Sequence, residues 1–462
     1  MSVIETDYLV VGAGMAGMGF VDSLLDVSDA EVVLVDRRAA PGGHWLESYP
    51  FVRLHQPSPW YGVASTPLGD GGLESDGPEQ GHYTRASGAE IRDYFSTLLR
   101  DRFLGSGRVR FLPATEHLGE GRVRSPETGA ESIVRARRGV VDATYTASRT
   151  PESSPPPFEV AEGVRLVTPA GLTRLDGPPE SVVVIGTGKT AMDTCGWLLE
   201  QGCPPERITW VRTRDAWLNN RRFLQPDRLA ALTVEGTVGF LEALAGATTE
   251  DQVFEHLERV GVLLRVDPEV WPTVFRGPTI SEHEIHQLRR ITDVVRLGRV
   301  LRVEPDRIVL EQGEVPTTPG RVHVHCAAPG LPDAPPVPVF AADRITVQYL
   351  SRLNMPLSSA VIARVEALDL PLEEKNRLCP ANFVDGGPLG YLQMLLQGLA
   401  TEGLWRGHPD LGPWFATTRV NATRDLPGAP PDPARDVLYG RLLEAIEPAY
   451  ASMARLTAGA SG

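Results

Sequence analysis

Residues 8–17 read Tyr-Leu-Val-Val-Gly-Ala-Gly-Met-Ala-Gly. The first four form an uninterrupted apolar run, which predicts a strand buried on both faces within a parallel sheet. The glycines follow with the spacing G-x-G-x-x-G and lead into a helical pattern that continues through Leu24 and Leu25. A second apolar strand over residues 31–35 ends in Asp36. This order predicts the β-turn-α-β unit of a dinucleotide-binding fold.

Each glycine has its own role in such a unit. Gly12 permits the tight turn, Gly14 lets backbone N–H groups approach a pyrophosphate, and Gly17 lets the helix pack against the strand. We expect Asp36 to accept hydrogen bonds from an adenosine ribose, and we group Arg37 beside it with the cofactor-binding residues. The alternative is a tight turn that holds no ligand.

The same pattern returns at residues 181–191, Ser-Val-Val-Val-Ile-Gly-Thr-Gly-Lys-Thr-Ala. Gly186 and Gly188 are the loop glycines of this second copy, and Ala191 stands where the first copy has its third glycine. An alanine at that position favours a nicotinamide dinucleotide. A Walker-type phosphate loop is excluded because Val183 stands where that motif requires glycine.

Basic residues near the second loop favour NADPH over NADH. The strand at 208–211 is followed by Arg212 and Arg214 rather than by an acid. Two guanidiniums could hold a 2′-phosphate by paired hydrogen bonds, whereas an acid would repel it. Lys189 and Thr190 open the helix, where the lysine ammonium could reach a phosphate. The alternative for Lys189 is a solvated helix start.

The chain is therefore predicted to be an α/β protein with two Rossmann-like dinucleotide-binding domains and a mainly helical insertion. The expected parts are 1–150 for the first part of the first domain, 151–222 and 298–320 for the second domain, 223–297 for the insertion, 321–425 for a return to the first domain with a substrate-pocket segment, and 426–462 for a C-terminal helix. Candidates for the pocket walls are the helical insertion and the 380–415 stretch with its aromatic residues Phe383, Tyr391, Trp405, Trp414 and Phe415, and ordinary core packing is the alternative for most of these aromatics. Arg221 and Arg222 are interpreted as charged surface, with a second phosphate contact as the alternative.

Composition excludes several classes of protein. Lys plus Arg total 45 against 59 Asp plus Glu, and the net charge of −14 argues against a broad electrostatic grip on nucleic acid or anionic lipid. No apolar stretch near the start is long enough to span a bilayer and no basic leader precedes it, so we expect a cytoplasmic protein that does not enter membranes. The four cysteines form no C-x-x-C pair and no metal-ligand spacing. A homodimer formed through the apolar insertion helices is left open.

Two further segments carry a resemblance to a known family. Residues 41–45 read Pro-Gly-Gly-His-Trp, and residues 52–57 read Val-Arg-Leu-His-Gln-Pro. With the two glycine loops, these segments make the chain similar to the flavin-containing and Baeyer–Villiger monooxygenases, class B flavoproteins with two dinucleotide-binding domains. The resemblance implies FAD in the first domain and NADPH in the second. It also implies that Gly43 and Trp45 line the FAD cleft.

A polar segment of that family faces the flavin ring. By position, Gln56 and Ser58 are the catalytic candidates, with His55 behind them. The resemblance implies that NADPH delivers hydride to flavin N5 and that reduced flavin captures O2 as a C4a-hydroperoxide. This species would oxygenate an amine, a thioether or a ketone in a small metabolite.

The sequence departs from the family pattern at several points. Tyr145 follows Ala143 and Thr144 where the family has glycine, and the F-x-G-x-x-x-H fingerprint is missing between the domains. Asp343 is a candidate for the FAD ribityl chain, but it lacks a preceding glycine, and a plain turn aspartate is the alternative. These departures leave open an NAD(P)H-dependent flavin reductase or dehydrogenase without oxygen insertion, and a non-catalytic nucleotide sensor.

Overall fold

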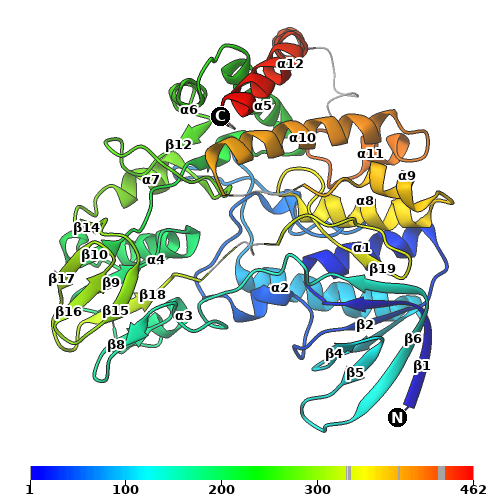
Figure 1. Ribbon diagram of the computed structural model, residues 1–462, viewed down its shortest axis with the longest axis horizontal. Coiled ribbons are helices and arrows are strands. Elements are labelled where there is room, and N and C mark those ends of the chain that lie inside the picture. Colours follow the sequence, from blue (N-terminus) through cyan, green and yellow to red (C-terminus); the bar gives the residue numbers. More distant parts are fainter. Residues whose placement is uncertain are drawn as a thin grey trace.

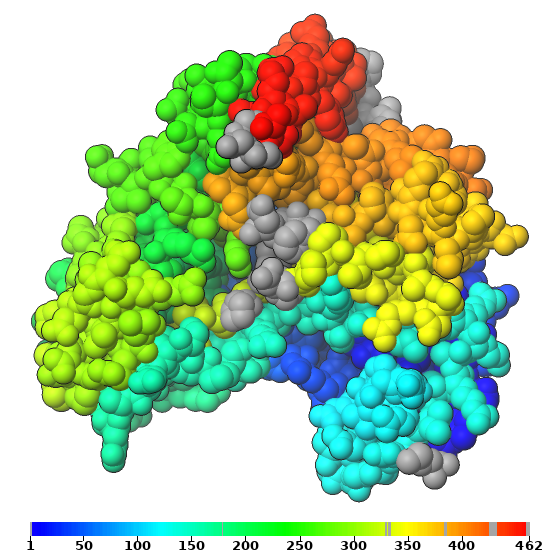
Figure 2. Space-filling model, in the orientation of Figure 1, coloured from blue at the N-terminus to red at the C-terminus, as the bar shows by residue number. Residues whose placement is uncertain are grey.

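The computed structural model describes residues 2–177, 179–328, 330, 334–382, 386–424 and 432–460. Two largely parallel sheets lie apart from each other, and helices lie across the top of the view (Figure 1). We call the part around the seven-stranded sheet the first lobe and the part around the five-stranded sheet the second lobe. The outline of the molecule is indented between the two lobes at the lower edge of Figure 2.

The sheet of the first lobe has the strand order β3-β2-β1-β6-β5-β4, and β19 also pairs with β6. Its strands are β1 (Ser2–Val11), β2 (Val32–Val35), β3 (Val109–Leu112), β4 (Glu116–Gly119), β5 (Arg122–Arg124), β6 (Glu131–Asp142) and β19 (Arg344–Thr346). β1 runs parallel to β2 and to β6, with Val11 opposite Val35 and Asp142. The carboxyl ends of these three strands therefore meet at one edge of the sheet. Every residue of β2 is buried, as expected for a strand covered on both faces.

Helices cover this sheet and close its core. They are α1 (Met15–Val27), α2 (Gly88–Thr97), α8 (Met355–Ala367), α9 (Leu372–Leu378) and α11 (Gly412–Thr417). α1 and α8 pack so closely that a Cβ added at Gly19 would lie 2.2 Å from Ser359 Oγ. α2 begins at the predicted capping box, in which Glu90 N–H donates to Ser87 Oγ at 3.3 Å and Glu90 Oε2 accepts from Ser87 N–H at 2.7 Å.

The sheet of the second lobe has the order β14-β10-β9-β18-β8, and its strands are all parallel. Its strands are β8 (Arg165–Val167), β9 (Val182–Ile185), β10 (Ile208–Val211), β14 (Val294–Val295) and β18 (Val322–His325). The helices α3 (Pro169–Leu172) and α4 (Lys189–Glu200) belong to this lobe. A smaller sheet beside it has the order β17-β16-β15-β7. Its strands are β7 (Glu159–Val160), β15 (Val300–Val303), β16 (Arg307–Leu310) and β17 (Gly313–Pro316).

A helical cap joins the insertion to the C-terminal part of the chain. Its helices are α5 (Ala230–Ala245), α6 (Glu250–Arg259), α10 (Pro388–Gly407) and α12 (Pro433–Ala460), whereas α7 (Glu282–Leu288) packs against α4 in the core of the second lobe. A small sheet of the insertion contains β11 (Leu218–Asn220), β12 (Leu263–Leu264) and β13 (Thr279–Ile280). α12 lies along α5, and Arg441 makes paired hydrogen bonds of 2.9 and 2.8 Å with Glu242. Within the described residues, no helix combines the length and apolar character that a membrane span needs.

The structure differs from the predicted domain boundaries at two strands. β14 lies within 223–297, the range predicted as a helical insertion, yet it pairs with β10 in the second sheet. β18 lies within the predicted return segment 321–425, yet it is inserted between β9 and β8. Its four residues are buried, because this strand is covered on both faces and paired on both edges. The chain returns to the first sheet only at β19.

Candidate dinucleotide-binding and active site

The first glycine loop joins β1 to α1. Gly14 is the N-cap of α1, and no side chain of the described residues caps this helix. Its first backbone N–H groups therefore remain available to an anion. A Cβ added at Gly17 would lie 1.9 Å from Gly12 O, so only glycine lets the helix leave the strand at this distance.

Asp36 binds the loop from the end of β2. It is 5 % exposed, and its two carboxylate oxygens accept from the N–H groups of Ala13 at 2.7 Å and Arg38 at 2.8 Å. Each oxygen keeps a second lone pair, which could accept a ribose hydroxyl. Arg37 follows Asp36 and is exposed.

The segment predicted to line a FAD cleft lies against the same loop. Gly42 N–H donates to Ala13 O at 2.8 Å, and a Cβ added at Gly43 would lie 3.0 Å from Gly14 Cα. Trp45 is 7 % exposed and donates its indole N–H to Tyr61 Oη at 2.8 Å. The structure therefore places Gly43 at the loop and shows Trp45 packed in the core of the first lobe.

The second glycine loop repeats this geometry between β9 and α4. Gly188 is the N-cap of α4, which again lacks a side-chain cap among the described residues. Gly186 has a φ of +148°, and a Cβ added there would lie 2.8 Å from the Cys326 carbonyl oxygen. Ala191 is fully buried, whereas Thr190 is half-buried in the first turn. The backbone of this turn therefore also offers donors to an anion.

Arg212 does not lie where a phosphate contact was predicted. It is 1 % exposed, pairs with Asp215 at 2.6 Å, and lies 4.6 Å from the centroid of the Trp210 ring. Burial lowers the pKa of Arg212 against the opposing effect of Asp215. Because this side chain is enclosed and already paired with an acid, it is not free to bind a 2′-phosphate.

Arg214 is the exposed arginine at this end of β10. Burial lowers its pKa, and so do the nearby guanidiniums of Arg276 and Arg299. The mutual influence of three cations marks this edge as a region of positive potential. Arg276 comes from the insertion, so a pattern around the second strand alone could not reveal it.

Lys189 lies in a contact between the lobes. Its Nζ donates to Glu284 Oε1 at 3.2 Å and to Asp193, one turn further along α4. Tyr49 of the first lobe donates its hydroxyl to the other oxygen of Asp193 at 2.7 Å. Since Lys189 is 8 % exposed and both of its partners are acids, its charge is already neutralised.

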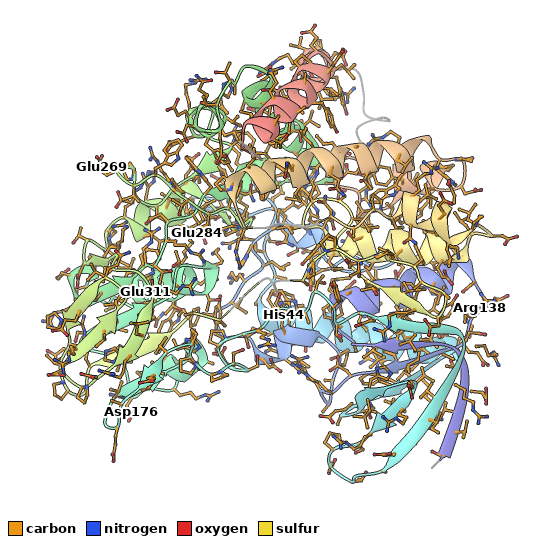
Figure 3. The ribbon with its side chains drawn as sticks, in the orientation of Figure 1. His44, Arg138, Asp176, Glu269, Glu284 and Glu311 are labelled. Carbon is orange, nitrogen blue, oxygen red and sulfur yellow. The ribbon has the colours of Figure 1, made fainter. Side chains whose placement is uncertain are left out.

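Arg221 extends this contact and is 1 % exposed, so its interpretation as charged surface is wrong. It donates through Nε to the His55 carbonyl at 2.7 Å and through Nη2 to Glu284 Oε2 at 2.6 Å. Burial alone would raise the pKa of Glu284, but the Lys189 and Arg221 charges outweigh burial and hold that pKa below its ordinary value. Glu284 lies on the side of the second lobe that faces the middle of the molecule (Figure 3). We define the interlobe network as Tyr49, Glu79, Lys189, Asp193, Arg221 and Glu284.

An aromatic pair continues this contact along α4. Lys189, Asp193 and Trp197 follow at four-residue intervals and share one face of the helix. The ring of Phe51, from the first lobe, stacks on Trp197 with a centroid distance of 4.9 Å. No sequence pattern indicates this contact, because its partners are far apart in the chain.

The three catalytic candidates face different surroundings. Ser58 is 3 % exposed, and its Oγ accepts from Ala86 N–H at 2.8 Å, so it holds the backbone. His55 Nε2 lies 3.9 Å from Asp193 Oδ2, and burial together with the Lys189 charge lowers the pKa of His55 to about 3. Its imidazole is therefore neutral at pH 7. Gln56 lines a cavity.

Asp343 lies at the wrong end of its strand for a ribityl contact. It precedes β19, which runs parallel to β6 with Thr346 opposite Asp142. The glycine loop lies at the other edge, where the carboxyl ends of β1 and β6 meet. Asp343 is exposed, and its carbonyl accepts from Val140 N–H at 3.0 Å. The alternative interpretation, a turn aspartate, fits this position.

The cavity that Gln56 lines has a volume of about 180 Å³ and lies between the first lobe, the insertion and α10. Gln56, Trp60 and residues 352–354 form its wall on the side of the first lobe. The remaining wall is largely apolar and includes residues of α5, α6 and α10. Of the aromatic candidates, Tyr391 lines this cavity.

The other aromatic candidates lie elsewhere. Trp405 and Phe415 are fully buried in the core of the first lobe. Trp414 borders a separate hollow, with the Arg364 guanidinium 4.4 Å from its ring centroid. Phe383 lies outside the described residues.

Comparison with known proteins gives close relatives without a known function. No protein-family model matches the chain. The uncharacterized protein Rv2000 of Mycobacterium tuberculosis is 43 % identical over 424 residues, which cover 92 % of this chain and 79 % of that protein. The uncharacterized protein Mb2023 of Mycobacterium bovis matches with the same identity and coverage.

Solved structures identify the fold. A polycyclic ketone monooxygenase from the fungus Thermothelomyces thermophila has a TM-score of 0.53 at 12 % identity, covering 96 % of this chain and 89 % of that one. An oxidized steroid monooxygenase bound to NADP has a TM-score of 0.51 at 16 % identity, covering 79 % and 84 %. An open structure of cyclohexanone monooxygenase has a TM-score of 0.50 at 13 % identity, covering 96 % and 98 %. The chain therefore belongs to the family of the mycobacterial proteins, and it has the fold of these ketone and steroid monooxygenases, in agreement with the two-domain fold that the sequence predicted.

Proposed function

We propose that this protein is an FAD-dependent, NADPH-using monooxygenase that oxygenates a small molecule with O2. The proposal depends mainly on one observation. The segment 42–60 of the first lobe contacts the first glycine loop through Gly42 and contacts α4 through Tyr49, one turn from the start of that helix. The same segment lines the cavity through Gln56 and Trp60. Two uncapped dinucleotide helices and one cavity are thus joined by a single segment.

The first loop fits the adenosine diphosphate part of FAD. The uncapped N-terminus of α1 would bind the pyrophosphate. Gly17 has no side chain, which lets this helix pack closely against the glycine loop. Asp36 would accept from the ribose through its unused lone pairs. A bound flavin supplies the redox chemistry, taking hydride from NADPH and reacting with O2. Asp343 is not part of this site.

The second loop fits NADPH. The uncapped N-terminus of α4 would bind the pyrophosphate. Arg214, supported by Arg276 and Arg299, would pair with the 2′-phosphate in the role first expected of Arg212. Lys189 would orient α4 through the interlobe network rather than contact a phosphate.

The protein's own part in the reaction is to position the reactants and exclude water. The Gln56 amide can donate to or accept from a group in the cavity. The neutral His55 imidazole adds no charge beside it. The mostly apolar walls keep bulk water from the reacting atoms, which favours oxygen transfer over loss of the oxygen to solvent.

The test starts with the visible spectrum of the purified protein and proceeds to turnover. We expect bound flavin, NADPH oxidation that is stimulated by substrate, and incorporation of isotopically labelled dioxygen into the product. NADPH oxidation that yields only hydrogen peroxide or reduces an added acceptor would instead identify a reductase. Tight cofactor binding without any NADPH oxidation would identify a sensor.

A further inference from the structure

The cavity wall is chemically uneven. On the side of the first lobe it carries Gln56 and Trp60. Toward the cap most of its side chains are leucine, valine and phenylalanine, among them Phe240 of α5, Leu257 of α6 and Leu395 of α10. A bound molecule would therefore meet hydrogen-bonding groups at one end and hydrocarbon at the other.

Most polar side chains of the cap wall are already engaged. Asn219 pairs with the Tyr391 hydroxyl at 2.9 Å, and Asn220 donates to Gly261 O at 2.9 Å. Thr233 Oγ1 donates to Gln225 O at 2.7 Å. The Gln56 amide, by contrast, has no hydrogen-bond partner among the described residues. Gln56 is thus the group best placed to recognise a polar atom of a ligand.

Charge in the wall is confined to one residue of the described part of the chain. Arg352 lines the cavity, and its Nε lies 3.5 Å from Glu402 Oε1. A bound ammonium would meet this guanidinium and would lack a carboxylate in the described wall to replace its lost hydration. A carboxylate ligand would compete with Glu402 for an arginine that is already paired.

We infer that the cavity takes a neutral molecule with one hydrogen-bonding group and an apolar chain. The polar group lies at Gln56 and the chain extends between α5 and α10. This inference rests on the proposed function and narrows it, because ketones and thioethers fit the cavity and protonated amines do not. The orientation also brings the polar group to the segment that joins the two dinucleotide sites.

The experiment measures binding and turnover separately on the purified protein with its cofactor. The probes are unbranched methyl ketones of increasing length, with primary alkylamines of the same lengths as matched cations. We expect ketone affinity, measured by calorimetry, to rise about four-fold per added methylene until the chain fills the cavity. We expect each amine to bind at least about ten-fold more weakly than its ketone. Equal affinity of amine and ketone, or affinity that does not change with chain length, would overturn the inference.

Two variants test the orientation. Thr237→Phe adds volume to the α5 wall and should shorten the longest ketone that binds, whereas Thr237→Val keeps the volume and should not. Gln56→Leu should weaken ketones but leave alkanes of equal length unchanged. If the long ketone binds equally to both Thr237 variants while both remain folded, the chain does not lie between α5 and α10.

The outcomes keep this inference separate from the proposed function. Length-dependent ketone binding without NADPH oxidation would refute the monooxygenase and leave the cavity assignment intact. NADPH-dependent oxygenation with no dependence on ketone chain length would refute the cavity assignment and leave the monooxygenase proposal intact.

Discussion

The two glycine-loop units have the same backbone but opposite charges at the residue that follows their second strand. Gly12 N–H donates to Val35 O at 2.8 Å, and Gly186 N–H donates to Val211 O at 3.1 Å, so the loops start alike. Asp36 then turns toward its own loop and accepts from Ala13 N–H, whereas Arg212 turns away and pairs with Asp215. The start of a helix presents unpaired N–H donors, so a glycine loop there favours a neighbouring acid over a guanidinium. A basic residue that follows the second strand therefore needs an acidic partner from outside the glycine loop, as Arg212 has in Asp215.

The units also differ at their third small residue. In the first unit a Cβ at Gly17 would collide with the backbone of Gly12, while in the second unit Ala191 carries its Cβ without exposure to solvent. The first helix therefore leaves its strand more tightly than the second one does. This difference predicts unequal tolerance to the same substitution.

The largest effect should come from Gly17→Ala. The added Cβ would lie 1.9 Å from Gly12 O, which is backbone and cannot yield without moving the loop. We expect a loss of about 4 kcal/mol or more in the free energy of unfolding, together with loss of flavin. The matched change in the second unit, Ala191→Gly, should cost only about 1 kcal/mol. Denaturant unfolding of both variants measures this contrast, and equal losses would contradict it.

Arg212→Ala should have the next largest effect. It leaves Asp215 buried, with Arg296 as its remaining partner at 2.8 Å. We expect a loss of about 3 kcal/mol in the free energy of unfolding. Arg207→Ala, which breaks a solvent-exposed pair with Glu180 in the same lobe, is the control and should cost less than about 1 kcal/mol. If Arg212→Ala unfolds normally but selectively weakens NADPH, Arg212 is a phosphate ligand after all.

Arg214→Ala should change cofactor preference rather than stability. Loss of a charge-assisted contact to the 2′-phosphate should weaken NADPH by about 1.5–3 kcal/mol and leave NADH unchanged. KM values for the two cofactors measure this difference. Arg302→Ala, in which an exposed arginine that pairs with Glu304 is removed, serves as the control. Equal weakening of NADPH and NADH would refute the assignment of Arg214.

Glu284→Gln should have the smallest effect, and it should depend on pH. Gln can still complete the capping box with Ser281, so the change removes mainly the charge shared with Lys189 and Arg221. Since the folded pKa of Glu284 is depressed, its contribution is fully present above the ordinary value of 4.5 and is lost as pH falls below it. We expect a loss of about 1 kcal/mol at pH 7, because Asp193 and Glu79 still pair with Lys189 and Arg221, and this loss should shrink under acid conditions. Unfolding curves of both proteins at pH 7 and under acid conditions test this prediction. A loss in the free energy of unfolding that does not change with pH would contradict it.

The sequence predicted those features that depend on neighbouring residues. The glycine spacing and the buried apolar runs indicated both dinucleotide units, and the capping box marked the start of α2. The orientation of Arg212 could not be predicted, because Asp215 and the Trp210 ring that hold it act through the fold. Asp343 was misplaced for a similar reason, since its distance from the glycine loop depends on the direction in which β19 joins the sheet. The interlobe network and Arg276 combine residues from segments far apart in the chain, for which a single sequence gives no signal.

The helix that begins at the second glycine loop, α4, is also the surface against which the first lobe packs. Lys189, Asp193 and Trp197 belong to one rigid helix. The first turn of α4 therefore cannot move without also moving the residues that Tyr49 and Phe51 contact. A nucleotide that binds at the N-terminus of α4 and displaces its first turn would therefore also disturb the packing of the first lobe against this helix. For this reason, binding of the electron donor and the relative position of the two lobes should change together.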